Sequence, residues 1–141
     1  MTDWPLPLQQ IIDEFKDCFD RMERYELLFD YAKKLPHELQ TKDWNDENRV
    51  QGCQSEAHVE CKLDENGGFQ IHGAADANIV QGLIAILAIG VDGLPPSQVA
   101  SLSPTFVDEM DVKASLTPSR ANGFLNMFEM IRTTASDMSG V

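Results

Sequence analysis

Basic residues are scarce in this sequence. It has 11 lysines and arginines against 23 aspartates and glutamates, which gives a formal net charge of −12 at pH 7 and a sequence pI of about 4.4. A field of this sign repels phosphate backbones and anionic membranes. We therefore expect no nucleic-acid partner and no membrane partner. A basic groove on a partner protein fits this charge, although a surface that simply keeps the protein in solution is the plainer interpretation.

Long apolar runs are also missing. The most apolar stretch, residues 79–91, contains Gln81 and is shorter than the roughly 20 residues that a membrane span requires, so it predicts a buried helix. The first residues, Met1 to Pro5, lack the charged start and apolar core of a secretion signal and the arginines of a transit segment. We therefore expect a cytoplasmic protein.

Cysteine is the third scarce residue. Three cysteines cannot all pair, and a reducing compartment disfavours disulfides, so no structural disulfide scheme is expected. What is present is a chain of 141 residues, 43% hydrophobic and 24% charged, which can bury a core without metals or disulfides. One domain over residues 1–141 is predicted.

Two helices are predicted near the start of the chain. Apolar residues recur every three or four positions over residues 8–22, which is the pattern of one buried helical face. The pattern crosses a break at Asp20, which with Glu23 resembles a capping box and begins a second helix. An aperiodic loop over residues 36–48 follows, in which Trp44 is a candidate anchor onto the core.

A β-hairpin is predicted next. Residues 56–63 alternate between apolar and polar side chains, turn formers occupy residues 64–68, and the alternation resumes over residues 69–72. The inward set of the first strand is Ala57, Val59, Cys61 and Leu63, and the wet set is Glu56, His58, Glu60 and Lys62. Two strands alone are marginal, so a third strand near Val50, or the flanking helices, must cover the apolar face.

Helices dominate the second half of the chain. Asp76 can cap an apolar helix over residues 79–89, and a proline in the first turn marks a short helix over residues 104–110. A last helix begins near Pro118, and residues 133–141 are expected to fray. The elements predicted are therefore several helices and one small sheet.

The three cysteines differ in their sequence surroundings. Cys18 lies on the apolar stripe of the first helix and Cys61 on the inward set of its strand, so both are predicted to be buried and unreactive. Residues 51–55 match neither period, and Gly52 permits a tight, exposed turn there. Cys53 is thus predicted to be a loop-tip thiol, although an incidental surface cysteine fits these residues equally well.

A metal site is a competing interpretation, because Cys53, His58 and Cys61 are close in sequence and are all good zinc ligands. His58 and Cys61 differ by an odd number, however, so on a regular strand their side chains leave opposite faces. His37 and His72 have no ligand-type spacing to this set. We therefore expect no metal and no cofactor.

The sequence offers no recognisable enzyme motif. It contains no Gly-x-Ser-x-Gly elbow, phosphate-binding loop or dinucleotide fingerprint. His58 could serve Cys53 as a base, but on an exposed strand face it is more simply a solvated polar residue. A self-contained enzyme is not predicted.

Several ordered motifs resemble the SufE family over nearly the whole chain. Residues 49–55, Arg-Val-Gln-Gly-Cys-Gln-Ser, are similar to the active-loop signature of that family. Further agreement is found at residues 75–83 (Ala-Asp-Ala-Asn-Ile-Val-Gln-Gly-Leu), 119–123 (Ser-Arg-Ala-Asn-Gly), 24–26 and 35–36. One departure is Ala57-His58, where family members commonly have Val-Trp, and this departure bears on the partner interface or the resting position of the loop.

The resemblance implies an α+β domain shared with iron–sulfur scaffold proteins of the IscU type, with a small antiparallel β-sheet packed against helices. It implies that Cys53 accepts sulfur as a persulfide from a pyridoxal-phosphate-dependent cysteine desulfurase of the SufS or CsdA type, stimulates that enzyme, and relays the sulfur to a downstream acceptor or cluster scaffold in iron–sulfur cluster assembly. The family's characteristic arginine falls on Arg120.

Local positive charge is needed if Cys53 is to react as a thiolate. A free thiol with a pKa of about 8.5 is only a few per cent ionised at neutral pH, and Arg49 and Arg120 are the candidates to raise that fraction. Arg120 falls in the first turn of a predicted helix, where the dipole disfavours a cation by roughly 0.3–1 kcal/mol. We predict that Arg120 approaches the Cys53 loop or a docked partner, with a surface salt bridge as the alternative.

Two other functions remain open at this point. A metal-binding or cluster scaffold of the IscU type would need at least three converging ligands. A regulatory module that docks to a desulfurase without accepting sulfur would need no reactive thiol at all.

Overall fold

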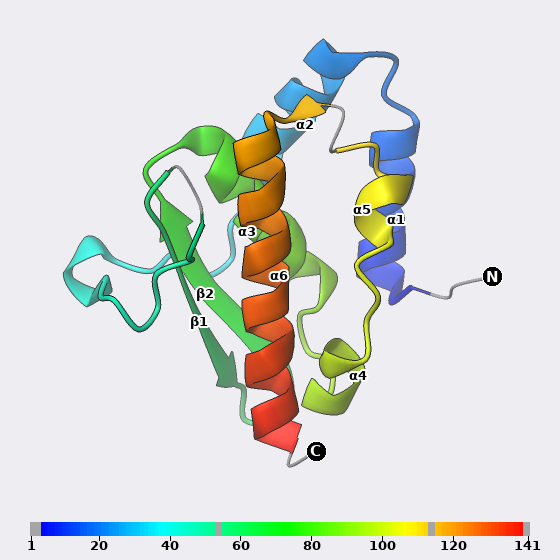
Figure 1. Ribbon diagram of the computed structural model, residues 1–141. Helices are drawn as coiled ribbons and strands as arrows, with labels where there is room; N and C mark the ends of the chain where they lie inside the picture. Colours follow the sequence, from blue (N-terminus) through cyan, green and yellow to red (C-terminus); the bar gives the residue numbers. More distant parts are fainter. Residues whose placement is uncertain (1–3, 53–54, 113–114, 140–141) are drawn as a thin grey trace.

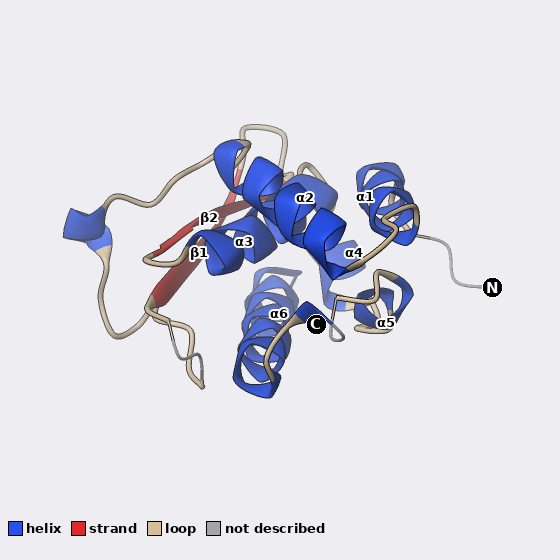
Figure 2. Ribbon diagram, turned by 90° about the horizontal axis from the view of Figure 1, so that it is seen from above, coloured by secondary structure: helices blue, strands red, loops and turns tan. Residues whose placement is uncertain are grey.

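A computed structural model of the chain describes residues 4–52, 55–112 and 115–139 (Figure 1). Its elements in chain order are α1 (Leu6–Lys16), α2 (Arg21–Lys33), the 3-10 turn η1 (Thr41–Asp43), β1 (Ala57–Leu63), β2 (Phe69–Ala75), α3 (Asn78–Gly90), α4 (Pro96–Ala100), α5 (Phe106–Glu109) and α6 (Pro118–Ser139). The hairpin of β1 and β2 lies on one side of the molecule, with α3 against β2 and α6 against β1. In the view from above, α1 and α5 lie on the side of the molecule away from the hairpin (Figure 2). The predicted α+β class is confirmed.

The first helix ends earlier than the apolar pattern predicted. Its buried face stops at Phe15, and α1 ends at Lys16. Asp20 caps α2 as predicted: its Oδ1 accepts from the Glu23 backbone N–H at 3.0 Å, and the Glu23 carboxylate accepts from the backbone N–H of Phe19 at 2.7 Å. Because the chain turns between the two helices, Phe19 is 88% exposed. The continuation of the stripe to residue 22 was therefore wrong.

The hairpin forms as predicted, but its second strand is longer than the alternation over residues 69–72 indicated, since β2 runs to Ala75. The two strands are antiparallel, with Ala57 opposite Ala75 and Leu63 opposite Phe69. The turn is stabilised by Asp64, whose carboxylate accepts two backbone N–H groups of the turn at 2.8 Å each. Leu63 lies opposite the fully buried Phe69, on the face that the alternation predicted, but it is 46% exposed.

The segment near Val50 extends the sheet by single bridges. Val50 donates its N–H to the carbonyl of Ala57 at 2.8 Å, and Val59 donates to the carbonyl of Asn48 at 2.8 Å. Arg49 and His58 form an isolated antiparallel bridge. Within the described residues this segment is bridged to β1 but is not a full strand, and the flanking helices cover the apolar face.

Helix α3 is the core helix, as predicted. Its residues are buried over almost their whole length, and a Cβ at Gly82 would overlap the backbone carbonyl of Leu28 on α2. Gly82 is therefore needed for the close packing of α2 on α3. The predicted cap was wrong, since Ala77 occupies the N-cap position and no side chain caps the helix.

The end of the chain is more ordered than its composition indicated. Helix α6 runs to Ser139, and Ala135 is fully buried. The tail predicted to fray from residue 133 is therefore helical as far as Ser139, because α4 packs along α6. The short helix α4 had not been predicted. None of the helices within the described residues is long and apolar enough to cross a membrane.

Candidate functional site

The segment that precedes Cys53 is hydrogen-bonded to α6. Asn126 on this helix donates its side-chain N–H to the carbonyl of Gln51 at 3.1 Å. Gly52 has a φ of 77°, and a Cβ at this position would collide with the amide of Asn126. The positive φ therefore favours glycine at 52, and a larger residue would in addition displace the Asn126 side chain. Cys53 and Gln54 lie outside the described residues.

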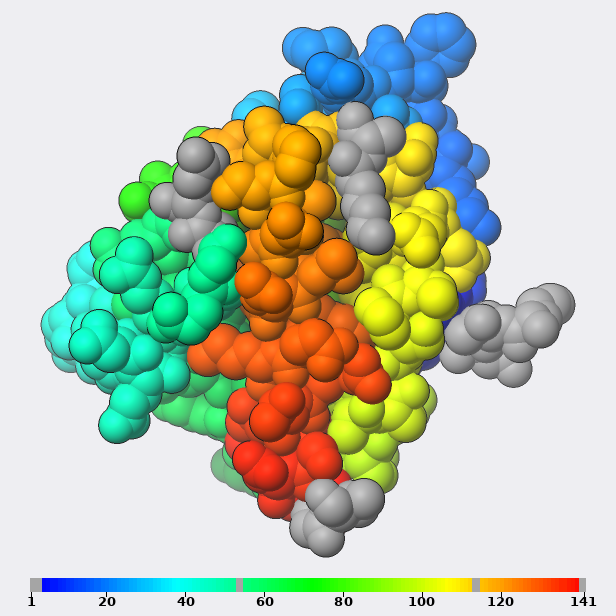
Figure 3. Space-filling view, viewed as in Figure 1, coloured from blue at the N-terminus to red at the C-terminus, as the bar shows by residue number. Residues whose placement is uncertain are grey.

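The segment that follows this loop is hydrogen-bonded to Asp76, in the turn between β2 and α3. The backbone N–H of Glu56 donates to the Asp76 carboxylate at 3.2 Å, and the backbone N–H of Asp76 donates to the Glu56 carbonyl at 3.0 Å. Asp76 thus holds the loop and does not cap the helix as predicted. The segment before Cys53 is thus held by Asn126 of α6, and the segment after it by Asp76 in the turn between β2 and α3. The space-filling view shows the segment around residue 50 beside the first half of α6 (Figure 3).

His58 occupies the base of the same loop and is buried, with 2% of its surface exposed. Its Nδ1 lies 2.6 Å from Asn48 Oδ1, and its Nε2 lies 2.8 Å from Glu56 Oε2. The ring of Trp44 stacks on it at 4.7 Å between centroids. The prediction of a solvated histidine was wrong because the segment before the loop, with Trp44, covers this face of β1. Trp44 therefore packs on His58 and not on the hydrophobic core, so its predicted role as an anchor onto the core was wrong.

Cys61 is a poor nucleophile in its surroundings. It lies on the helix-facing side of β1 and is partly buried, beside Met130 and Thr134 of α6. Burial, and then the negative charge of Glu60, raise the pKa of the Cys61 thiol to about 12. The thiol therefore stays protonated at neutral pH.

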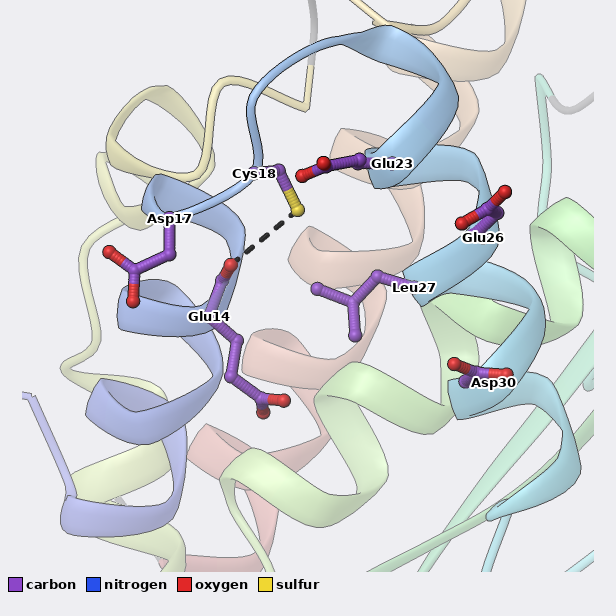
Figure 4. Close-up of a pocket in the computed structure, with 7 residues that line it drawn as sticks. All are labelled: Glu14, Asp17, Cys18, Glu23, Glu26, Leu27 and Asp30. Atoms are coloured by element: carbon purple, nitrogen blue, oxygen red, sulfur yellow. Dashed lines mark hydrogen bonds between the residues drawn. The ribbon is translucent and has the colours of Figure 1, made fainter.

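Cys18 lies outside the core, so its predicted burial was wrong. It follows α1 and lines a groove of about 410 Å³ between α1 and α2, with its Sγ–H donating to the Glu14 carbonyl at 3.5 Å (Figure 4). The other residues of this groove are mainly acidic: Asp17, Glu23, Glu26, Leu27 and Asp30. Burial and the charge of Glu23 raise the pKa of the Cys18 thiol. Both effects disfavour the thiolate form of Cys18.

Arg120 lies in the first turn of α6, as predicted. Its backbone N–H donates to the Thr117 hydroxyl at 3.3 Å, and among the described residues its buried Nε has no hydrogen-bond partner. The first turns of α6 lie at the same end of the molecule as the loop (Figure 1). Arg49 is exposed. A contact of either arginine with Cys53 remains a prediction.

The described residues include no group of three histidine, cysteine or acidic side chains that could hold a metal ion. His58 has both ring nitrogens engaged by Asn48 and Glu56. Cys61 points to the other face of β1, as the strand spacing indicated. The geometry of these two residues therefore does not favour a shared metal site.

Comparison with known proteins gives concordant results. The family model SufE, described as an Fe-S metabolism associated domain, matches residues 9–135. An uncharacterized SufE-like protein of Synechocystis is 40% identical over 131 residues, which cover 93% of this chain and 81% of that protein. SufE-like protein 1 of Arabidopsis thaliana, named as chloroplastic/mitochondrial, is 33% identical over 132 residues, or 93% of this chain but 35% of the relative. The cytoplasmic location expected for this chain stays a prediction.

The fold is also found in a solved structure. A solution structure of a hypothetical protein from Thermus thermophilus superposes with a TM-score of 0.81 over 99% of this chain and 100% of the other, at 21% identity. At this identity the likeness concerns the fold alone. The family match and the relative that is 40% identical over most of its length show that the chain belongs to the SufE family.

Proposed function

We propose that this protein accepts sulfur on Cys53 from the persulfide of a cysteine desulfurase of the SufS or CsdA type. The Cys53 thiolate attacks the outer sulfur of the donor persulfide, and a new sulfur–sulfur bond forms on Cys53. The bond between the outer sulfur and the donor cysteine breaks, and its electron pair leaves on the donor as a thiolate. No carbon–sulfur bond is broken by this chain, so it acts as a carrier and not as a self-contained enzyme.

The observation that carries the proposal is the contrast among the cysteines. Burial and acidic neighbours raise the pKa of Cys18 and of Cys61, so neither supplies much thiolate at neutral pH. The segments on the two sides of Cys53 are held by Asn126 of α6 and by Asp76, which lies between β2 and α3. This arrangement supports Cys53 as the working thiol, presented from a loop whose ends are fixed.

The acidity of the chain supports a protein partner with a basic docking surface. With a net charge of −12, the protein would be attracted to such a surface over a distance of about a Debye length, and the attraction weakens with salt. We further propose that docking stimulates the desulfurase, and that the sulfur passes to a downstream acceptor or cluster scaffold for iron–sulfur assembly.

The test is transfer of labelled sulfur from a candidate desulfurase, read by mass spectrometry of the intact chain and its peptides. Wild-type protein should gain one sulfur, on Cys53, and Cys53→Ser should gain none. The matched controls are Cys18→Ser and Cys61→Ser, which should keep transfer within about twofold of wild type, because their thiols stay protonated. Sulfur on Cys18 or Cys61 in the wild type would refute the assignment. Full stimulation of the desulfurase by Cys53→Ser would show that docking, and not transfer, is the function.

Arg120 is tested on the same assay. Replacement by Ala should lower the rate of sulfur acceptance at least tenfold, the effect of losing about 1.4 kcal/mol of a charge-assisted interaction. Arg132→Ala is the matched control on the same helix, since Arg132 is paired with Glu129 at 2.7 Å and lies toward the other end of α6. Unchanged transfer in a folded Arg120→Ala variant would remove this arginine from the mechanism.

A further inference from the structure

The outer side of α2 is more apolar than a solvent-facing helix requires. Phe19, directly before the helix, is 88% exposed, and Met22 and Phe29 on the helix are 63% and 40% exposed. These are three of the five large hydrophobic side chains that are exposed within residues 4–52, 55–112 and 115–139. Single exposed apolar residues are normal, whereas a group of them on one element indicates an interaction surface.

Local structure does not explain the exposed ring of Phe19. Asp20 is the N-cap of α2, and a hydrophobic residue directly before an N-cap commonly packs on the fourth residue of the helix. For Phe19 that residue is Arg24, whose guanidinium instead contacts the Ser115 hydroxyl and the Asp111 carboxylate. Phe19 therefore lacks the apolar contact that its position usually provides, and its side chain faces solvent.

Met22 and Phe29 belong to a row of side chains that lies beside the groove between α1 and α2. They share one face of α2 with Glu26, because the three residues are spaced by four and three positions. The groove, of about 410 Å³, is lined by residues of α2 that repeat this spacing one position later (Figure 4): Glu23, Leu27 and Asp30. The row, the groove and Phe19 are therefore neighbours, and we call them together the α2 surface.

The groove carries negative charge that the chain itself does not neutralise. Five carboxylates and no cation line it among the described residues. Glu14 accepts a hydrogen bond from the Tyr31 hydroxyl, and Glu23 accepts one from a backbone N–H. The other carboxylates have no hydrogen bond or ion pair in the part of the chain that the structure describes: Asp17, Glu26 and Asp30.

The nearest cations are engaged elsewhere or lie outside the groove. Lys16 of α1 pairs with Glu109 at 3.3 Å. Arg21 and Lys33 are exposed, but they lie at the two ends of α2 and do not line the groove. The mutual repulsion of the groove carboxylates is therefore relieved only by a positive charge from outside the described chain.

We propose that the α2 surface docks a basic segment of a partner protein. Arginine or lysine side chains of that segment enter the groove, where their charge meets the carboxylates and their methylene stems pack on Leu27, which points into the groove (Figure 4). An apolar side chain of the same segment covers Phe19 and Met22. A volume of about 410 Å³ holds a few side chains but not a whole helix, so a short segment is sufficient.

Other occupants fit this surface less well. A second copy of the chain would bring two acidic grooves together, and each chain carries a net charge of −12, so repulsion opposes self-association here. Phosphate-rich occupants are repelled for the same reason. The α2 surface is built from α1 and α2, whereas the segments beside Cys53 are held by Asn126 and Asp76. The inference therefore does not depend on the proposed function of Cys53.

The first experiment is an NMR titration of the full wild-type chain with a short blocked peptide of alternating arginine and leucine. The backbone amides of Phe19, Leu27 and Asp30 should shift. The same peptide with citrulline in place of arginine keeps its shape without its charge and should bind at least about tenfold more weakly. Cys53→Ser should bind the peptide as wild type does. Shifts spread evenly over the exposed acidic residues would show attraction by net charge alone and would overturn the proposal.

The second experiment tests the apolar part of the surface. Phe19→Ser combined with Met22→Ser keeps every charge and should weaken binding of the arginine–leucine peptide about tenfold, as the loss of an apolar anchor does at an interface. Both side chains are mostly exposed, so this variant should fold. Leu63→Ser is the matched control, since Leu63 is also exposed but lies on the hairpin. Equal affinity of the double variant and wild type would refute the docking role of the apolar residues.

The third experiment separates the groove from the net charge of the chain. Glu26→Gln combined with Asp30→Asn removes charge from the groove, should weaken binding of the peptide about two- to tenfold and should flatten its dependence on salt. Asp46→Asn combined with Glu65→Gln removes the same charge from exposed positions beside the hairpin and in its turn, and should change the affinity by less than about twofold. Equal weakening by the two pairs would overturn the assignment of the groove.

A final measurement addresses self-association. Sedimentation of the wild type without peptide should show no association that Phe19→Ser abolishes, because the acidic grooves of two copies repel each other. A dimer that is lost in Phe19→Ser would assign the α2 surface to a second copy of the chain and would overturn the proposal.

Discussion

The two faces of the hairpin are built on different principles. The face toward α3 and α6 is apolar and largely buried, and its side chains need only exclude water and fill space. Its buried residues are Ala57, Val59, Phe69 and Ile71. Because apolar burial has no direction, this face stabilises the sheet without specifying where a particular loop lies.

The opposite face is covered by the segment that precedes the loop and is largely polar. Trp44 stacks on His58, the Asn48 amide reaches Glu60, and His37 stacks on His72. Hydrogen bonds depend on direction, and an unmade one is costly when buried. The apolar face therefore supplies stability, whereas the polar face fixes the base of the candidate site.

The largest effect should come from the apolar face. Phe69→Ala removes a fully buried ring and should lower the free energy of unfolding by about 3–5 kcal/mol. Leu63→Ala is the matched control, since Leu63 lies directly opposite Phe69 in the sheet but is 46% exposed. Urea denaturation measures both. Equal losses for the two variants would contradict the assignment of this face as the main source of stability.

A smaller effect with a different signature should come from the polar face. Asn48→Ala leaves several partners without their hydrogen bonds and should cost about 1–3 kcal/mol. Unlike the core variant, it should also change the rate at which Cys53 is alkylated in the folded protein, because Asn48 is one of the two partners of His58. Urea denaturation and native-state alkylation separate the two effects. An unchanged alkylation rate would contradict the assignment of the polar face as the part of the hairpin that fixes the base of the candidate site.

The hairpin, the start of α2 and the core helix α3 could be predicted from the sequence. The alternation over residues 56–63 and 69–72 predicts the hairpin, the Asp20 and Glu23 pair predicts the start of α2, and the apolar run predicts α3 as the core helix. These signals are local, since each is contained in a few residues that fold into one element. The SufE resemblance likewise rests on short ordered motifs.

The contacts of His58, Asp76 and Cys18 could not be predicted in the same way. A strand with a period of two places His58 on a wet face, and it is Trp44, 14 positions earlier in the sequence, that covers it. Asp76 has the residue type and the position of a helix cap, but it accepts from Glu56, which is distant in sequence. Cys18 continues the helical spacing although its helix has already ended. Each error concerns a tertiary contact or a chain turn that overrides a local pattern.

The burial of Cys61 on the helix-facing side of the hairpin can be tested at alkaline pH. Burial raises the pKa of Cys61 from 9.0 to about 12, so the folded state keeps this proton more tightly than the unfolded state does. The stability that this contributes is complete below 9.0 and is lost as the pH rises toward about 12. Wild type should therefore lose stability over this range faster than Cys61→Ala, measured as the change in urea midpoint. Tyr31, whose pKa is also raised, is common to both proteins. Parallel curves would contradict the burial of the thiol.

The smallest effect is expected at acidic pH on the polar face. Burial, and then the neighbouring His37, lower the pKa of His72 below 6.5, so the unfolded state binds this proton more readily. The associated stability is complete above 6.5 and is lost as the pH falls through the lowered pKa. His72→Gln should therefore flatten the loss of stability on acidification relative to wild type, again in urea midpoints. His58→Phe is the comparison variant, because His58 lies on the same face of the hairpin but contacts Asn48 and Glu56 and not His37. If both variants flatten the acid limb alike, the two histidines do not differ in the way that their partners indicate.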